Sequence, residues 1–290
     1  MTGNSGLEGV VIGESRISSI IGTQLTYCGY EIDDLAENAE FEEVVFLLWH
    51  DHLPNKEELK AFKQELFDHA FLTDEAKGFY TTFVDKSVHP MSALRTAVSL
   101  LAHTDATAED QSEEATLRKA IRIQAKIPSI VAAIARTREG KEVIDPNPEY
   151  GYAKNFLYMM NGEEPTDVQV EAMNTALVLH ADHEINASTF AARVIVATLS
   201  DVYSGVTGAI GALKGPLHGG ANEQVMAMLE EIGSLENVES YIQKKFDNKE
   251  KVMGIGHRVY KEGDPRAKYL EDMARRLTEE NGQPALYEMS

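Results

Sequence analysis

Apolar residues recur along most of the chain at intervals of three and four, which is the spacing of one helix face. The clearest runs lie within residues 44–49, 94–101 and 121–134. Few stretches alternate between apolar and polar residues as a half-exposed strand does. The pattern therefore predicts a mainly helical, all-α protein.

Several residues mark where these helices break or begin. Pro128 lies inside the third run and is expected to kink or divide that helix, because proline lacks the backbone N–H that a helix interior uses. Residues 145–148, Asp-Pro-Asn-Pro, predict a loop. Thr166 and Gln169 then fit a capping box, which predicts the start of the next helix.

Two histidines follow that capping box at helical spacing. An apolar stripe within residues 170–177 leads to His180, and His183 lies one helical step further. We interpret His180 as a packed histidine with one hydrogen bond. Residues 185–188, Ile-Asn-Ala-Ser, break the stripe and supply helix caps. His183 is therefore expected at a helix end, where a ligand can reach it.

Three glycines, Gly205, Gly208 and Gly211, recur at intervals of three residues in an otherwise helical stretch. An interior glycine costs a helix about 1 kcal/mol relative to alanine. Close packing against another helix, from the same chain or from a second subunit, would offset that cost. The spacing therefore predicts a helix with one smooth, closely packed face.

The next segment, residues 214–223, holds His218 among glycines. Pro216 is expected to end the preceding helix, and Asn222 to cap the following one. His218 would then lie in a short turn, where the backbone fixes its orientation. Glycine beside a reacting group lets a ligand approach the backbone closely.

A second histidine, His257, lies among glycines within residues 253–267. Asp264 is a good N-cap and Pro265 suits a first helical turn, so Arg266 would lie at a helix N-terminus, a position that favours binding a carboxylate. The apolar positions that follow at helical spacing are expected to be buried: Ala267, Leu270, Ala274 and Leu277.

The formal charge of the 290 residues is −20. A protein that binds nucleic acid or an anionic membrane needs a basic surface, so both classes are excluded, and an anionic substrate must be held by a few local cations. No apolar run is long enough for a membrane helix. The single cysteine, Cys28, excludes an internal disulfide, and the first residues lack a leader pattern, so we expect a cytoplasmic protein.

Familiar cofactor and nucleophile motifs are absent from the sequence. Residues 180–184, His-Ala-Asp-His-Glu, lack the order of zinc hydrolases, so we expect no metal. There is no nucleotide P-loop, no Gly-x-Gly-x-x-Gly after a strand pattern and no Gly-x-Ser-x-Gly elbow. The remaining chemistry is that of an enzyme that binds small acids through histidines and an arginine, without a cofactor.

Several long motifs occur in the order found in one family. They are residues 30–35, Tyr-Glu-Ile-Asp-Asp-Leu, residues 89–95, His-Pro-Met-Ser-Ala-Leu-Arg, residues 179–184, and both glycine-flanked histidine segments. From Gly6 to Ser290 the chain resembles citrate synthase, and within that family the shorter bacterial enzymes of Gram-positive type.

The resemblance implies a fold and a reaction. The fold would be all-helical, with a large domain over residues 1–219 and a small domain over residues 220–290, in a homodimer. The reaction would be that of an acyltransferase, in which acetyl-CoA, oxaloacetate and water give citrate and CoA at the entry to the tricarboxylic acid cycle.

The resemblance also implies roles for individual residues. His218 would hydrogen-bond the thioester oxygen and stabilise the enol, and His257 would polarise the ketone of oxaloacetate and protonate the new alkoxide. His183 and Arg266 would hold oxaloacetate. The residues that would bind CoA are Lys251, Val252, Met253, Gly254, Ile255 and Lys261.

The sequence departs from the family in one respect. The Pro-x-Val-Asp motif that carries the family's carboxylate base does not occur in the 290 residues, and neither Asp272 nor Glu288 lies in a matching motif. The resemblance places that motif and two further substrate arginines beyond Ser290, so we expect a truncated chain with both domains incomplete and reduced stability. A 2-methylcitrate synthase acting on propionyl-CoA, and a non-catalytic homologue that binds CoA or oxaloacetate, remain alternatives.

Overall fold

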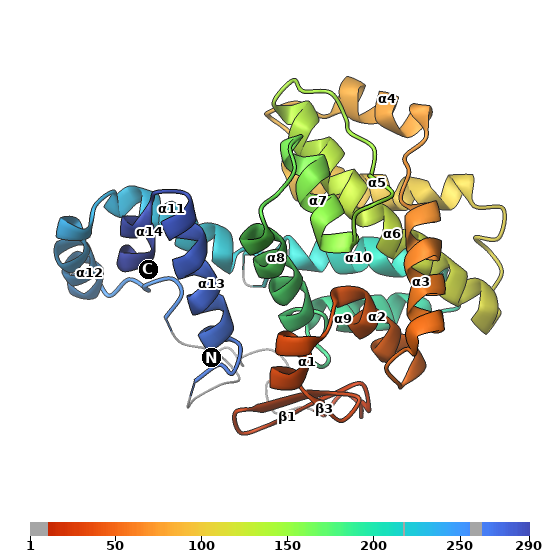
Figure 1. The fold of residues 1–290 in the computed structure, drawn as a ribbon, viewed down its shortest axis with the longest axis horizontal. Helices are drawn as coiled ribbons and strands as arrows, with labels where there is room; N and C mark the ends of the chain where they lie inside the picture. The colour runs from red at the N-terminus through yellow and green to blue at the C-terminus, as the bar shows by residue number, and fades with distance from the viewer. Residues whose placement is uncertain (1–10, 217, 256–262) are drawn as a thin grey trace, which may run out of the picture.

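The computed structural model describes residues 11–216, 218–255 and 263–290. These residues are mostly helical, as the sequence predicts (Figure 1). The helices of the first two thirds are α1 (Ile32–Asn38), α2 (Phe41–His50), α3 (Lys56–His69), α4 (Asp74–Phe83), α5 (Pro90–Leu101), η1 (Ala102–Thr104), α6 (Glu113–Arg138), α7 (Tyr152–Asn161) and α8 (Asp167–Leu179). The later ones are α9 (Ala187–Val196), α10 (Val202–Leu213), α11 (Ala221–Ile232), η2 (Leu235–Asn237), α12 (Val238–Asp247), α13 (Ala267–Glu280) and α14 (Pro284–Met289).

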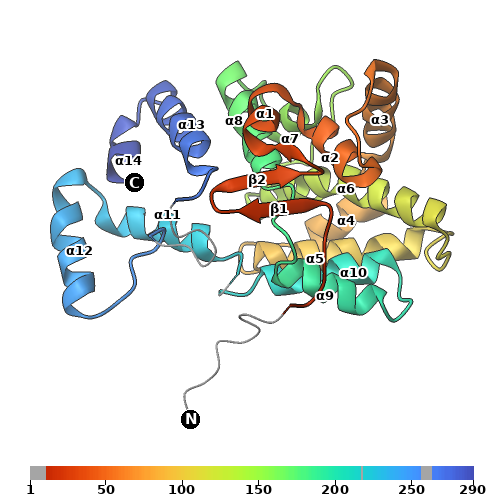
Figure 2. The same cartoon turned by 90° about the horizontal axis from the view of Figure 1, so that it is seen from below.

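A small antiparallel sheet precedes the helices. Its strands are β1 (Ser18–Ile21), β2 (Gln24–Tyr27) and β3 (Tyr30–Glu31), in the order β1-β2-β3. Leu25 and Tyr27 are fully buried and join the core formed with α1, α2 and α8. Figure 2 shows β1 and β2 beside these helices. The sheet is therefore part of the helical core rather than a separate flap.

Helix α6 runs through the middle of the molecule and contributes to two apolar cores. Ile121 and Ala125 lie in the core shared with α1, α2, α3 and α8, whereas Ile130 and Ile134 lie in a second core with α4, α5 and α10. The expected division at Pro128 is wrong, because α6 continues unbroken through that residue. Burial on both sides of the proline offsets its missing hydrogen bond.

Helices α9 and α10 form a closely packed pair. A Cβ added at Gly205 would lie 2.8 Å from Val196 Cγ1, and one at Gly208 would overlap the end of the Ile195 side chain. Side chains at these positions would force the two helices apart. The predicted close packing is confirmed, with the partner helix supplied by the same chain.

Helices α11 to α14 gather on one side of the molecule (Figure 1). From there α13 packs along α8: Arg276 donates to both carboxylate oxygens of Glu171 at 2.6 and 2.8 Å, and Thr166 bonds Glu280 at 2.9 Å. These pairs join the C-terminal half of α13 to the start of α8, so the two helices run antiparallel. The domain boundary at residue 220 stays a prediction.

The expected burial of the α13 apolar face is only partly right. No residue of α13, which the structure describes in full, is buried, and Leu270, Ala274 and Leu277 are half-exposed while Ala267 is exposed. Only Leu270 of these four packs against the first core. Helix α13 contacts the other helices along one side only, so part of its apolar face stays in solvent.

Two expected helix caps are wrong. Helix α11 begins at Ala221, and the Asn222 carboxamide accepts from the Glu223 N–H instead of capping. Helix α13 begins at Ala267, and Asp264 accepts from the Arg266 backbone N–H in a turn before the helix. Asparagine and aspartate form such local bonds readily, so sequence alone does not separate turn from cap.

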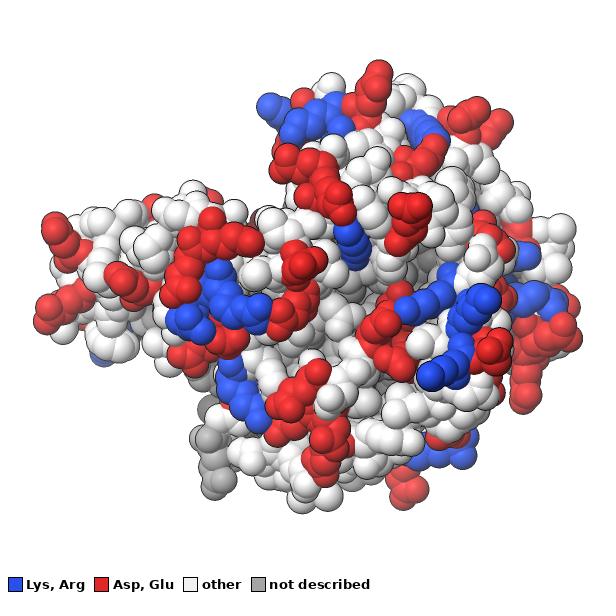
Figure 3. Space-filling model, in the orientation of Figure 1, with Lys and Arg blue, Asp and Glu red and all other residues white. Residues whose placement is uncertain are grey.

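The face of the molecule seen in Figure 3 carries many acidic residues, with lysines and arginines interspersed among them. Within the described ranges, no helix is long and apolar enough to cross a membrane. The same residues contain no group of three or more histidine, cysteine, aspartate or glutamate side chains suited to hold a metal ion.

Candidate active site

His183 lies in the connection between α8 and α9. This connection starts at His180, whose Nδ1 lies 2.7 Å from the Ala176 carbonyl oxygen. His180 makes the one hydrogen bond that was expected, but it is exposed rather than packed. His183 itself is half-buried, and its Nε2 atom is shielded from solvent. The predicted position of His183, just beyond a helix end, is confirmed.

The connection ends at a well-formed helix start. Asn186 is the N-cap of α9, and its side chain accepts from the N–H groups of Ser188 at 2.9 Å and Thr189 at 3.0 Å. This cap fixes where α9 begins and therefore where Ser188 lies. The cap expected within residues 185–188 is confirmed.

His218 lies in a tight turn after α10. Its backbone N–H donates to the Gly215 carbonyl at 3.0 Å, and the next N–H, of Gly219, donates to the Leu213 carbonyl at 3.1 Å. A Cβ on Gly219 would lie 2.5 Å from that Leu213 oxygen. The turn thus requires glycine at 219 for steric reasons, and the expected fixed backbone around His218 is confirmed.

A hydrogen bond joins His218 to the start of α9. The Ser188 Oγ atom lies 2.8 Å from His218 Nε2 and 3.0 Å from the Ala209 carbonyl oxygen. This contact brings the His218 turn to the same helix end that His183 precedes by a few residues. His218 therefore contacts the first turn of α9, and His183 lies in the connection that leads into the same helix.

Arg266 precedes α13 and pairs with Asp264 in two parallel hydrogen bonds. Its Nε donates to Oδ1 at 2.9 Å and a terminal nitrogen donates to Oδ2 at 2.7 Å. The Arg266 side chain is only 12% exposed. Because α13 runs antiparallel to α8, the N-terminal end of α13, which Arg266 precedes, is directed toward the end of α8 that leads into His183. The guanidinium is ordered in the fork geometry that suits a carboxylate.

Residues 251–255 connect α12 toward α13. Gly254 has φ +84, a conformation that glycine adopts without strain, and a Cβ there would lie 3.2 Å from Val225 of α11. Lys251 is exposed, and Ile255 keeps 75% of its surface. This segment is therefore accessible to a ligand. His257 and Lys261 lie outside the described residues.

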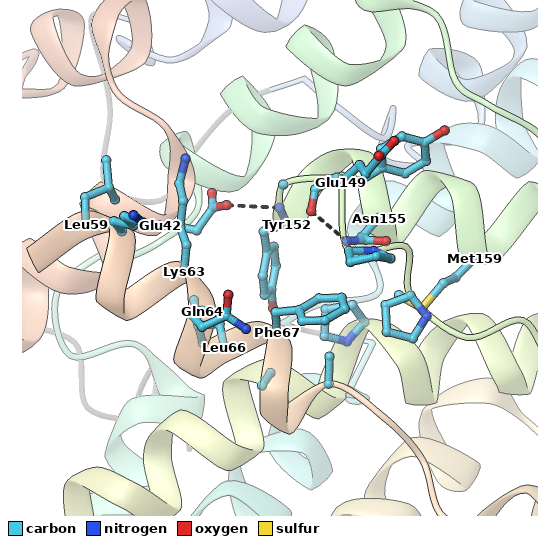
Figure 4. Close-up of a pocket in the computed structure, with 18 of the residues that line it drawn as sticks. Glu42, Leu59, Lys63, Gln64, Leu66, Phe67, Glu149, Tyr152, Asn155 and Met159 are labelled. Atoms are coloured by element: carbon cyan, nitrogen blue, oxygen red, sulfur yellow. Dashed lines mark hydrogen bonds between the residues drawn. The ribbon is translucent and has the colours of Figure 1, made fainter. Parts of the chain in front are cut away.

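A separate cavity of about 550 Å³ lies between α3, α6 and the segment before α7 (Figure 4). Its wall includes the buried Glu42 carboxylate, which accepts from the Tyr152 N–H at 3.0 Å. Burial raises the pKa of Glu42 above its ordinary value. None of the nominated site residues lines this cavity.

The sequence did not point to three residues that hold the site. They are Ser188, which contacts His218, and Ser18 and Tyr27, which hold the chain around His183. Each acts on a partner at least 30 residues away in the sequence. Only Ser188 carried a signal, as a cap candidate after His183.

Comparisons with known proteins give a consistent result. A family model described as "Citrate synthase, C-terminal domain" matches residues 6–290. Citrate synthase 2 of Bacillus subtilis is 60% identical over 290 residues, which are all of this chain and 78% of that protein. A 2-methylcitrate synthase of Mycobacterium tuberculosis is 46% identical over 268 residues, 90% of this chain and 66% of that protein.

A solved structure is also similar. It is the ternary complex of carboxymethyl coenzyme A and oxaloacetate with citrate synthase from Thermoplasma acidophilum. The two chains superimpose with a TM-score of 0.92 at 34% identity, over 98% of this chain and 75% of that one.

Proposed function

Because the chain belongs to the citrate synthase family, whose members are transferases, we propose that it condenses acetyl-CoA with oxaloacetate and water to give citrate and CoA. The observation that carries the proposal is the hydrogen bond between the His218 turn and Ser188 at the start of α9, the helix into which the His183 connection leads. The 60% identity to a citrate synthase along the whole chain supports it.

Oxaloacetate is a dianion, and the protein carries a net charge of −20. Binding therefore depends on local donors rather than on the overall field. Arg266 supplies a guanidinium that its paired hydrogen bonds to Asp264 hold in place, and His183 supplies a partly buried imidazole beyond the end of α8. In the proposed complex Arg266 holds a substrate carboxylate, while His183 and His257 bind the keto acid.

Acetyl-CoA is activated at His218. The Ser188 hydroxyl has a single hydrogen and lies within reach of both the Ala209 carbonyl and His218 Nε2. In the structure this hydrogen is directed at the Ala209 carbonyl. In the proposed complex the hydroxyl turns it to Nε2, so the imidazole proton must reside on Nδ1. Nδ1–H then donates to the thioester oxygen and stabilises the negative charge that develops in the enol.

The CoA moiety is proposed to bind along residues 251–255. Backbone groups around Gly254 are accessible there, and Lys251 is exposed for contact with phosphate. Lys261 supplies the second cation of this proposal. The residues come from the segment that separates α12 from α13.

Removal of the methyl proton of acetyl-CoA needs a carboxylate base. In the family that base lies in a Pro-x-Val-Asp motif, which the 290 residues do not contain. Loss of a general base typically slows a reaction about 10²- to 10⁴-fold. Substrate binding and turnover are therefore tested separately.

A second candidate is 2-methylcitrate synthase, which the 46% identity to a protein of that name favours. The two reactions differ by one methylene in the acyl group, which is worth only about 1–3 kcal/mol in a pocket. Propionyl-CoA in place of acetyl-CoA separates them. A homologue that only binds CoA or oxaloacetate would bind both ligands without turnover.

The proposal includes a homodimer and a cytoplasmic location. The α9–α10 pair exposes apolar side chains, with Val194 53% and Leu199 80% exposed, and no residue of α9, described throughout, is buried. A second copy of the chain would cover this face, because an apolar surface gains free energy when it leaves water.

Oxaloacetate binding tests the proposed site directly. We expect isothermal titration calorimetry to show binding that His183→Ala and Arg266→Ala each weaken about tenfold or more. Arg275→Ala is the matched control, because Arg275 is an exposed arginine of α13 that pairs only with its own helix in the described contacts. A folded protein that binds no oxaloacetate, or equal affinity in all four proteins, would contradict the proposal.

A further inference from the structure

The chain around His183 is held from outside its own helices. It changes direction there, and Glu184 adopts φ +56, a left-handed conformation that non-glycine residues rarely take. A residue in such a conformation persists only where its surroundings fix it. The contacts that fix this segment come from the small sheet near the N-terminus.

Tyr27 of β2 holds the residue before His183. Its hydroxyl donates to the Asp182 carbonyl at 2.9 Å and accepts from the Asp182 N–H at 3.3 Å. The Tyr27 side chain is fully buried. A buried hydroxyl bonded to both backbone groups of one residue fixes the position of that residue.

Ser18 of β1 holds the residue after His183. Its hydroxyl donates to the Asp182 carboxylate and accepts from the Glu184 N–H at 3.1 Å. The Asp182 carboxylate also accepts from the Glu184 N–H, at 3.0 Å. Ser18 therefore closes a small network around the left-handed Glu184.

The two holding residues form one cross-strand pair. Ser18 and Tyr27 lie directly opposite each other in the antiparallel register of β1 and β2. Opposite residues place their side chains on the same face of a sheet. One pair thus grips both neighbours of His183, which leaves that residue little freedom to move.

We propose that the Ser18–Tyr27 pair positions His183 for oxaloacetate, so that the N-terminal sheet is part of the substrate site. The inference rests on the proposed function for the role of His183. Neither residue touches the substrate; both act by fixing the backbone from which His183 projects. A small displacement of a binding group is enough to cost a large factor in affinity or rate.

Binding measurements on Tyr27→Phe and Ser18→Ala test this. We expect each to weaken oxaloacetate binding about tenfold while CoA binding, which uses residues 251–255, stays unchanged. The matched controls are Tyr30→Phe on β3, where the tyrosine is 40% exposed, and Ser19→Ala on the opposite face of β1. Both controls should bind oxaloacetate as the unmodified protein does. Equal loss of both ligands would indicate a general structural role and overturn the inference.

A double-mutant cycle and a spectroscopic reading make the test independent of turnover. In a His183→Ala background, Tyr27→Phe should weaken oxaloacetate binding no further. The ring signals of ¹⁵N-labelled His183, assigned with His183→Gln, should shift or broaden in both pair variants and stay unchanged in both controls. Unchanged ring signals in Tyr27→Phe and Ser18→Ala would overturn the inference, even if oxaloacetate does not bind. An oxaloacetate affinity that His183→Ala leaves unchanged would instead count against the proposed function.

Discussion

The Ser188 hydroxyl donates to the Ala209 carbonyl and contacts His218 Nε2, so its rotation sets which nitrogen of His218 carries the proton in the proposed mechanism. It lies within hydrogen-bond reach of His218 Nε2 and of the Ala209 carbonyl, and it has one hydrogen to give. A donor role toward Nε2 makes Nδ1–H available for the thioester oxygen. The serine therefore acts through the histidine rather than on the substrate.

We expect Ser188→Ala to lower kcat about tenfold or more, with a smaller change in the KM for oxaloacetate, because the imidazole loses its orienting partner. Steady-state kinetics of a catalytically active form of the protein measures kcat and KM separately. Thr198→Ala is the control, since it removes a hydroxyl bonded at 2.7 Å to the Ile195 carbonyl at the other end of α9. A Ser188→Ala protein with normal kcat would show that Ser188 does not orient His218.

At the scale of residues, sequence reasoning found the groups that carry chemistry and missed those that hold them. Glycine neighbours marked His218 because its turn has no room for a Cβ at Gly219. Ser18 and Tyr27 had no local signal, because their partners lie more than 150 residues later. Such contacts exist only once the sheet and α8 have packed together.

An ion pair with a buried carboxylate ties three elements together. Asp105, just after η1, lies 2.6 Å from the Arg122 guanidinium of α6 and accepts from the Tyr203 hydroxyl of α10 at 2.7 Å. Burial alone would raise the pKa of Asp105, but hydrogen bonds from Arg122, Thr107 and Tyr203 together hold that pKa well below its usual range.

The lowered pKa predicts how stability depends on pH. A carboxyl with a depressed pKa stabilises the fold above its unfolded value, about 3.9, and loses that contribution as the pH falls through the folded value. We expect Asp105→Asn to lose about 2 kcal/mol of unfolding free energy at pH 7. The difference should shrink progressively below about pH 4, where the Asp105 carboxyl of the unfolded chain takes up its proton while that of the native protein is still charged.

Urea unfolding at a series of pH values measures this. Glu109→Gln is the control, because Glu109 is exposed and only a few residues away. A constant difference between Asp105→Asn and the unmodified protein from pH 7 to pH 3 would show that the carboxylate charge does not stabilise the junction.

At the scale of elements, periodicity predicted the helices well, because most of them bury one face. The glycine face of α10 was also predictable, since only close packing offsets three glycines. The division of the helix at Pro128 was misjudged, because the burial that carries α6 past it comes from distant helices, whereas a kink there stays a prediction. The burial of the apolar face of α13 was misjudged for a related reason. A single sequence does not show how much of a helix other elements of the protein will cover.

The whole molecule presents an apolar face on α9 and α10 that a second copy would cover. We expect the protein to sediment in analytical ultracentrifugation with twice the 32.1 kDa of one chain, and Val194→Asp to shift it toward the monomer, because a buried charge destabilises an apolar interface. Leu235→Asp, at a residue that is also about half exposed but lies on η2, should leave the dimer intact. A monomer at all concentrations, or equal dissociation in both variants, would exclude this interface.

The arrangement of the whole chain was the part least accessible from periodicity. The all-helical class followed from the apolar pattern. The antiparallel packing of α13 on α8 involves an ion pair and a hydrogen bond between residues more than 100 positions apart. The division at residue 220 came from the resemblance and remains a prediction.

The most direct test of the account is the release of CoA thiol from acetyl-CoA, with and without oxaloacetate. The proteins to compare are the 290-residue chain and the same chain completed with the part of the Bacillus subtilis relative that the match leaves uncovered. The account predicts that the completed chain releases thiol only with oxaloacetate, that His218→Ala and His257→Ala abolish it, and that the 290-residue chain alone is at least about 100-fold slower. A completed chain that is folded and binds oxaloacetate, yet releases no thiol or releases it equally in both variants, would contradict the account.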